Sequence, residues 1–198
     1  MALQGGRGMA RPYRGAMEAP RDPRSSPVRA VLLDAGDTLV DEATQVTVDG
    51  EIVRAELIPG AAALVGALAG RWPLALVADG PRSTFANVLG HQHGLLDAFD
   101  ALAISGDVGV EKPDPAMFTT ALDALGVGAD GRAQVVMVGN NLRRDIAGAK
   151  ALGLTTVWID WAPRRRKVPR TPDEHPDHTI AEPLELLAVL ERLEAPEA

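Results

Sequence analysis

A short apolar run that ends in an aspartate constrains the fold of this chain more than any other feature. Residues 31–33 are apolar on both faces, which is typical of a buried strand in a parallel sheet. The run continues directly into Asp34 and two small residues. A carboxylate at the carboxyl end of a central parallel strand points into the crevice where open α/β sheets bind ligands. The stretch therefore predicts a ligand site at Asp34, with a simple structural turn as the alternative.

Strand-like and helix-like segments alternate along the rest of the chain. Further strands are predicted at residues 74–78, within 99–105, at 134–138 and at 155–159, with helices at 61–69, 83–89, 113–125, 143–152 and 183–193. This order predicts an α/β fold, a three-layer αβα sandwich with a mostly parallel, Rossmann-like sheet. Residues 44–53 are the exception, since Asp49-Gly50 between two β-branched runs predicts a short hairpin.

Composition restricts the class of protein. The chain has 198 residues and is 46% hydrophobic, which suits one domain over residues 28–198. Residues 1–27 are rich in Gly, Pro and Arg and lack the apolar core of a secretory signal, so we expect a disordered N-terminal tail. The absence of cysteine fits a reducing compartment, and we expect a cytoplasmic protein. The net charge of −7 and the lack of a long apolar run argue against nucleic-acid and membrane partners.

Polar residues follow three of the later predicted strands. Asp79 follows residues 74–78, Lys112 lies just before a predicted helix, and Asn140 and Asp145 follow residues 134–138. These groups would converge with Asp34 at one edge of the sheet. A carboxylate nucleophile, a lysine and a second carboxylate beside Mg²⁺ form a set suited to phosphoryl transfer, in which an aspartyl phosphate forms and water cleaves it.

The sequence resembles the haloacid dehalogenase-like (HAD) hydrolase superfamily over about residues 28–193. The pieces LLDAGDTL, EKPDPAMF and VMVGNNLRRDIAGAKALGLTTVWI occur in the order and spacing of that superfamily. The resemblance implies that Asp34 is the nucleophile, with Thr38 as the threonine of the same motif. It implies that Lys112 is the charge-stabilising lysine. It also implies that Asp145 and the backbone carbonyl of Gly36 join Asp34 around Mg²⁺.

Three positions depart from the superfamily pattern. Gly36 stands where the family has its general acid/base aspartate, and the neighbouring Asp37 does not obviously substitute for it. Ala78 replaces a Ser or Thr that contacts the phosphoryl group, and Asn140 replaces the first aspartate of the fourth motif. Asn140 can still ligate the metal. We expect backbone amides around residues 36–37 and 78–79 to hold the phosphate.

These matches and departures predict a Mg²⁺-dependent hydrolase, a phosphatase of weak or narrow activity. The alternative is a catalytically impaired HAD-fold binding or regulatory protein. Only the predicted hairpin lies between Val40 and Pro59, where capped family members carry a far longer insert, so the chain resembles a capless member. An open crevice admits a phosphorylated small molecule or a macromolecule. The free edge of the hairpin could pair with a second copy of the chain.

Two other features have structural explanations. Residues 164–167 form the basic run Arg-Arg-Arg-Lys, which we interpret as a solvated loop because the whole chain is acidic. Trp158 and Trp161 bracket the end of the last predicted strand and are interpreted as packing residues.

Overall fold

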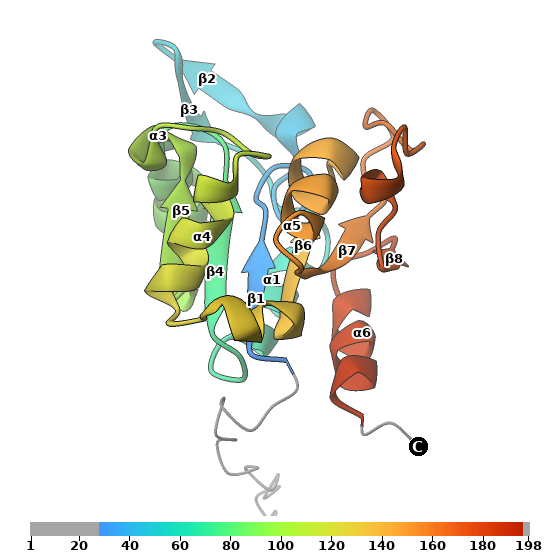
Figure 1. Cartoon of the computed structure of the whole chain (residues 1–198). Helices are drawn as coiled ribbons and strands as arrows, with labels where there is room; N and C mark the ends of the chain where they lie inside the picture. Colours follow the sequence, from blue (N-terminus) through green and yellow to red (C-terminus); the bar gives the residue numbers. More distant parts are fainter. Residues whose placement is uncertain (1–27, 196–198) are drawn as a thin grey trace, which may run out of the picture.

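A single parallel sheet organises the part of the chain that the structure describes, residues 28–195 (Figure 1). In this computed structural model the sheet has six strands in the order β5-β4-β1-β6-β7-β8, and every neighbouring pair is parallel. Their bounds are β1 (Ala30–Leu33), β4 (Leu74–Ala78), β5 (Ala101–Ile104), β6 (Val135–Gly139), β7 (Thr155–Ile159) and β8 (His178–Ile180). The predicted α/β class is confirmed. The predicted tail, residues 1–27, lies outside the described residues.

Both faces of the sheet are covered, because alternate residues of each strand enter different cores. In β1, Val31 and Leu33 belong to one hydrophobic cluster, whereas Ala30 and Leu32 belong to another. The first cluster is covered by α1 (Ala61–Leu68), the π-helical segment η2 (Ala86–Gln92) and α6 (Glu185–Glu194). The second is covered by α4 (Pro115–Ala124) and α5 (Gly148–Lys150), which lie in front of the sheet in Figure 1. The fold is thus the three-layer sandwich that the sequence predicts.

The predicted hairpin is present and projects beyond the carboxyl ends of the strands (Figure 1). It consists of β2 (Val46–Val48) and the antiparallel β3 (Glu51–Arg54). Asp49 and Gly50 both have positive φ, 51° and 83°, as a tight two-residue turn between such strands requires. The side-chain amide of Asn87 donates to the carbonyl of Ile52 (3.2 Å), which ties the hairpin to the helical layer.

Several element bounds differ from the prediction. The helix expected at residues 113–125 begins two residues later, because Asp114 caps it by accepting from Ala116 N (2.9 Å). The helix expected at residues 83–89 consists of α2 (Arg82–Phe85) followed by η2. The one expected at residues 143–152 begins as the π-helical segment η5 (Leu142–Ala147) and continues as α5.

Some short elements are absent from the prediction. The edge strand β8 spans only three residues after a proline-rich loop, too short for a periodic pattern. The others are α3 (Ser105–Val108), η1 (Glu42–Thr44), η3 (Leu96–Ala98), η4 (Ala129–Gln134) and η6 (Pro172–Glu174). No helix among residues 28–195 is long and apolar enough to cross a membrane.

Residues 164–167 lie in a partly exposed loop, as the sequence predicts. The prediction did not include their partners, because every side chain in this run forms an ion pair within the chain. Arg164 pairs with Asp37 and Asp41, Arg165 with Asp37 and Glu42, Arg166 with Glu174, and Lys167 with Asp160. The run therefore fastens the loop after β7 to the loop after β1.

Two glycines allow a test of how tightly the helices pack. A Cβ at Gly148 would lie 2.8 Å from the buried ring of Phe118, whereas a Cβ at Gly66 in α1 would meet nothing within 4 Å. We expect Gly148→Ala to lower the free energy of unfolding by about 1–3 kcal/mol through overpacking. We expect Gly66→Ala to raise it by about 0.5–1 kcal/mol, because alanine loses less backbone entropy. Urea denaturation of both variants measures this, and equal effects would contradict the close approach of α5 to α4.

Candidate active site

The predicted site residues meet at the carboxyl edge of the sheet. Asp34 follows β1, Asp79 follows β4 and Asn140 follows β6, and β4 and β6 are the two neighbours of β1. Because the three strands are parallel, their ends bring these side chains to one crevice. The crevice contains a pocket of about 60 Å³. Its lining consists of Asp34, Gly36, Glu42, Asp79, Lys112, Asn140, Asn141, Arg144, Asp145 and Arg165.

Lys112 is the centre of this cluster and is 3% exposed. Its Nζ lies 2.6 Å from Asp34 Oδ1 and 2.8 Å from Asp145 Oδ1, and it donates to the carbonyl of Val77 (2.8 Å). Burial alone would lower the pKa of Lys112, but the charges of Asp145 and Asp34 outweigh it and raise that pKa. The ammonium group is therefore held charged between two carboxylates.

The second oxygen of Asp34 has its own partners. Thr38 Oγ1 donates to Asp34 Oδ2 (3.0 Å), and Asn140 Nδ2 lies 3.5 Å from the same oxygen. The Asp34 amide donates to the carbonyl of Val138 (2.9 Å), which fixes the backbone next to β6. Asp34 is thus oriented on both oxygens while its carboxylate faces the pocket.

Asp145 is buried beside Lys112 and has an incomplete set of partners. Its Oδ2 accepts from the amide of Asn141 (2.8 Å), and its buried Oδ1 contacts the Lys112 ammonium group but no other donor among the described residues. Burial raises the pKa of Asp145, although the charge of Lys112 opposes that rise. A Cβ at Gly139 would lie 2.4 Å from the Asp145 carboxyl group, so only glycine fits there. The site therefore contains a buried carboxylate oxygen that can bind a further ligand.

Asn140 faces a group of oxygens. Its side-chain amide contacts the carbonyl of Gly36, and it lies 3.4 Å from Thr38 Oγ1 and 3.5 Å from Asp34 Oδ2. The two ends of an amide are assigned from such contacts alone, and turning the group would present its oxygen to the same point. Among residues 28–195, no three His, Cys, Asp or Glu side chains form a metal-binding group. Two carboxylates, a carbonyl and an amide are nevertheless a donor set that fits Mg²⁺, which needs only one or two carboxylates.

Two of the residues expected to hold phosphate do not line the pocket. Asp37 is fully buried, its amide donates to Val40 O (2.7 Å), and Arg164 and Arg165 bind its carboxylate. Ala78 belongs to the hydrophobic core. Gly36 and Asp79 do line the pocket. Asp79 is held by the amide of Lys112 (2.9 Å) and by Arg144 (3.2 Å), so it shapes the wall of the pocket.

A family comparison agrees with this geometry. The family model described as haloacid dehalogenase-like hydrolase matches residues 29–153. The chain belongs to this hydrolase family. The match includes the elements from β1 to α5 and therefore every site residue discussed so far except Arg164 and Arg165.

Named relatives of this HAD-like hydrolase are similar over part of their length. A phosphoserine phosphatase from Thermus thermophilus is 38% identical over 89 residues, which are 45% of this chain and 33% of that protein. The pyrimidine 5'-nucleotidase YjjG from Escherichia coli is 37% identical over 103 residues, 52% of this chain and 44% of that protein. The chain thus spans less than half the length of these relatives.

Solved structures share the fold. A HAD phosphatase from Thermococcus onnurineus superposes with a TM-score of 0.64 at 21% identity, over 84% of this chain and 99% of that one. The protein YfnB from Bacillus subtilis, determined bound to magnesium, gives a TM-score of 0.59 at 27% identity, over 68% of this chain and 56% of that one. At 21% identity, the likeness to the Thermococcus onnurineus protein shows a shared fold alone.

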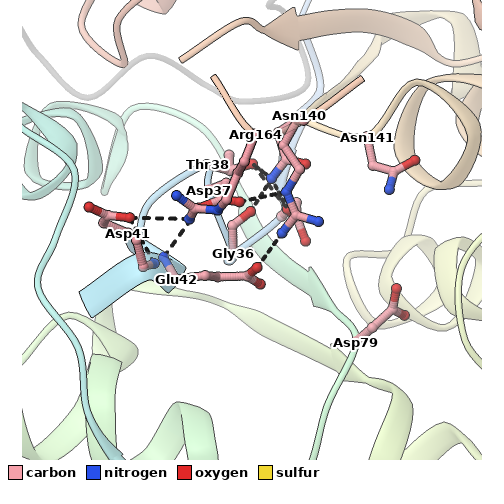
Figure 2. A network of polar contacts seen from close by, with 12 residues as sticks. Gly36, Asp37, Thr38, Asp41, Glu42, Asp79, Asn140, Asn141 and Arg164 are labelled. Atoms are coloured by element: carbon pink, nitrogen blue, oxygen red, sulfur yellow. Dashed lines mark hydrogen bonds and ion pairs between the residues drawn. The ribbon is translucent and has the colours of Figure 1, made fainter. Parts of the chain in front are cut away.

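Glu42 occupies the space beside Gly36 in this HAD-like chain. Figure 2 shows the Glu42 carboxyl group beside Gly36. A Cβ at Gly36 would overlap Glu42 Oε1, so the Glu42 carboxyl group fills the volume of a residue-36 side chain. The other Glu42 oxygen forms an ion pair with Arg165. Burial raises the pKa of Glu42, and the charge of Arg165 opposes that rise.

Sequence reasoning missed four residues that line the pocket: Glu42, Asn141, Arg144 and Arg165. Asn141 and Arg144 lie within the fourth motif and could have been found from their place after β6. Arg165 belongs to the basic run, and such a run indicates that acidic partners lie nearby. No local sequence pattern identified Glu42 as one of those acidic partners.

We expect Gly36 and Glu42 to be energetically coupled. Gly36→Ala should lower the free energy of unfolding by about 1 kcal/mol, because the new methyl group displaces the Glu42 carboxylate from Arg165. In a Glu42→Ala background the same change should cost less than about 0.5 kcal/mol, since the space is then free. A double-mutant cycle by chemical denaturation measures the difference. If the effects of the two substitutions on the free energy of unfolding are additive, Gly36 and Glu42 do not compete for the same space.

Proposed function

We propose that this HAD-like hydrolase is a Mg²⁺-dependent phosphatase that acts through an aspartyl phosphate on Asp34. The observation that carries the proposal is the buried cluster in which Lys112 bridges Asp34 and Asp145 beside a small polar pocket. Relatives named phosphoserine phosphatase and glyceraldehyde 3-phosphate phosphatase support the reaction class. Because the chain spans only part of those proteins, we propose the reaction class from them but not their substrates.

Asp34 is the proposed nucleophile. One of its carboxylate oxygens attacks phosphorus, the bond from phosphorus to the leaving-group oxygen breaks, and that oxygen keeps the electron pair. Water then attacks the phosphorus of the aspartyl phosphate and releases inorganic phosphate and free Asp34. Lys112 offsets the repulsion between the carboxylate and the anionic substrate, as do backbone amides around Gly36 and Asp79. The hydrogen bond from Thr38 keeps the attacking carboxylate oriented.

Asp34, Asp145, Asn140 and the carbonyl of Gly36 are the groups that would hold Mg²⁺. The buried Oδ1 of Asp145, which contacts only Lys112 among the described residues, and the oxygens facing Asn140 support this assignment. The ion would supply positive charge to the phosphate oxygens. The magnesium-bound structure of YfnB provides independent support from a similar protein.

Glycine at residue 36 is expected to restrict the activity. Without an acid/base aspartate the leaving group departs unprotonated, and such a loss typically costs about 10²–10⁴ in rate. Ala78 supplies no hydroxyl to the phosphoryl group, and Asn140 brings no charge. A HAD-fold binding or regulatory protein that keeps the pocket without turnover is the second candidate, and these three residues favour it.

The substrate is proposed to be a phosphorylated small molecule or macromolecule, in a cytoplasmic protein. The short hairpin in place of a longer insert leaves the pocket open to either kind of substrate. Its β2 edge, where Val46 and Val48 are exposed, could also pair with a second copy. Residues 28–198 are proposed to form the catalytic domain.

Substitution of the nucleophile tests the proposal. With Mg²⁺, we expect hydrolysis of p-nitrophenyl phosphate or acetyl phosphate by the wild type and only background release by Asp34→Asn, because an amide cannot attack phosphorus. Chelation of Mg²⁺ should have the same effect on the wild type. The exposed Asp123 on α4 provides a matched control, since Asp123→Asn should retain full activity. Equal phosphate release by wild type and Asp34→Asn would exclude the enzyme and favour the binding protein.

The choice of leaving group tests the role of Gly36. Acetyl phosphate and aryl phosphates should be cleaved with a kcat/KM about 10²-fold or more above that of sugar phosphates, because their leaving groups need no proton. Phosphate release from a panel of both kinds, at one pH, measures the ratio. Equal efficiency on both kinds would show that another group supplies the proton.

A further inference from the structure

A second pocket adjoins the phosphate pocket on the side of the hairpin. Its volume is about 170 Å³, and it shares Gly36, Glu42 and Asp79 with the phosphate pocket. A phosphate bound near Asp34 would therefore point its ester oxygen, or a terminal oxygen, toward this second space. The position suggests that the second pocket receives the part of the substrate that leaves.

Apolar side chains form about half of the walls of the second pocket. They come from separate parts of the chain, namely β3, the loop after β1, α2 and η2. The principal wall residues are Val40, Ile52, Phe85, Val88 and Leu89. The apolar side chains stabilise a ligand whose apolar surface they remove from water. The ring of Phe85 favours an aromatic neighbour.

The size of the pocket limits its occupant. An engineered protein cavity of about 150 Å³ with similar Leu, Ile and Phe walls takes up one benzene molecule. A pocket of about 170 Å³ therefore has room for one six-membered ring and little more.

The charges at the junction of the two pockets are balanced. Asp79 pairs with Arg144, and Glu42 pairs with Arg165. The other polar groups in the lining, Gln45 and Thr84, are uncharged. Nothing in the lining therefore offers a free charge to a charged substituent on the ring, and the apolar part of the walls would disfavour one.

We propose that the second pocket binds a single uncharged aromatic ring, so that the substrate is an aryl phosphate monoester. This inference rests on the proposed phosphatase function and names its substrate class. When Asp34 attacks phosphorus, the bond from phosphorus to the phenolic oxygen breaks and a phenolate leaves, which takes its proton from water. A phenolate is a weak base, so this substrate class is also the one that suffers least from glycine at residue 36.

Adjacent residues of β3 provide the test and its control. Ile52 lines the pocket, whereas Val53 is 37% exposed and points to the other face of the hairpin. We expect Ile52→Trp to lower the ratio of kcat/KM for phenyl phosphate to kcat/KM for acetyl phosphate by about tenfold or more, because the indole fills the space for the ring. Val53→Trp should leave that ratio unchanged. An unchanged ratio in Ile52→Trp, or an equal fall in Val53→Trp, would overturn the inference.

A binding measurement separates this inference from the proposed function. Phenylphosphonate cannot be hydrolysed, and calorimetry with Mg²⁺ should show that it binds the wild type about tenfold more tightly than methylphosphonate does. Ile52→Trp should remove that advantage and Val53→Trp should keep it. If the wild type cleaves no phosphate ester, the phosphatase proposal fails. The affinities for the two phosphonates still test whether the second pocket binds an aromatic ring. Equal affinity for the two phosphonates would overturn the pocket assignment alone.

Discussion

The buried contact of Lys112 with Asp34 and Asp145 is the interaction on which the site depends. Removing three charged groups from water is costly, and the attraction between opposite charges at 2.6 and 2.8 Å offsets that cost only while all three remain together. Two carboxylates and one ammonium group leave an excess negative charge. The proposed Mg²⁺ beside Asp34 would balance this charge. Its position follows from the parallel order of β4, β1 and β6, which brings three strand ends to one point.

A second set of charges determines the shape of the pocket. Arg164 and Arg165 hold Asp37, which is buried in a positive-φ conformation of 53°. Arg165 also fixes Glu42 across the mouth of the site. Two loops that are far apart in the sequence thus act as one wall, and the hairpin completes it on the open side. A chain with so short an insert therefore still forms two adjoining pockets.

Sequence reasoning could predict the parts of the fold and of the site that depend on local patterns and on strand order. The strands at residues 74–78 and 155–159 have the predicted bounds because their apolar runs are bounded by polar or turn residues. The meeting of Asp34, Asp79 and Asn140 follows from parallel strand ends. The ion pair between Arg165 and Glu42 joins residues 123 positions apart and leaves no local pattern. The start of α4 at Pro115 depends on the Asp114 cap, which periodicity does not reveal.

The shared space between Gly36 and Glu42 also limits how the site can be redesigned. An aspartate at residue 36 and the glutamate at residue 42, in its present conformation, would compete for the same volume. A variant that introduces an acid at residue 36 therefore has to move the Glu42 side chain away from Arg165 or replace it. Glycine at residue 36 is in this sense one half of a pair, and the other half is a residue six positions away.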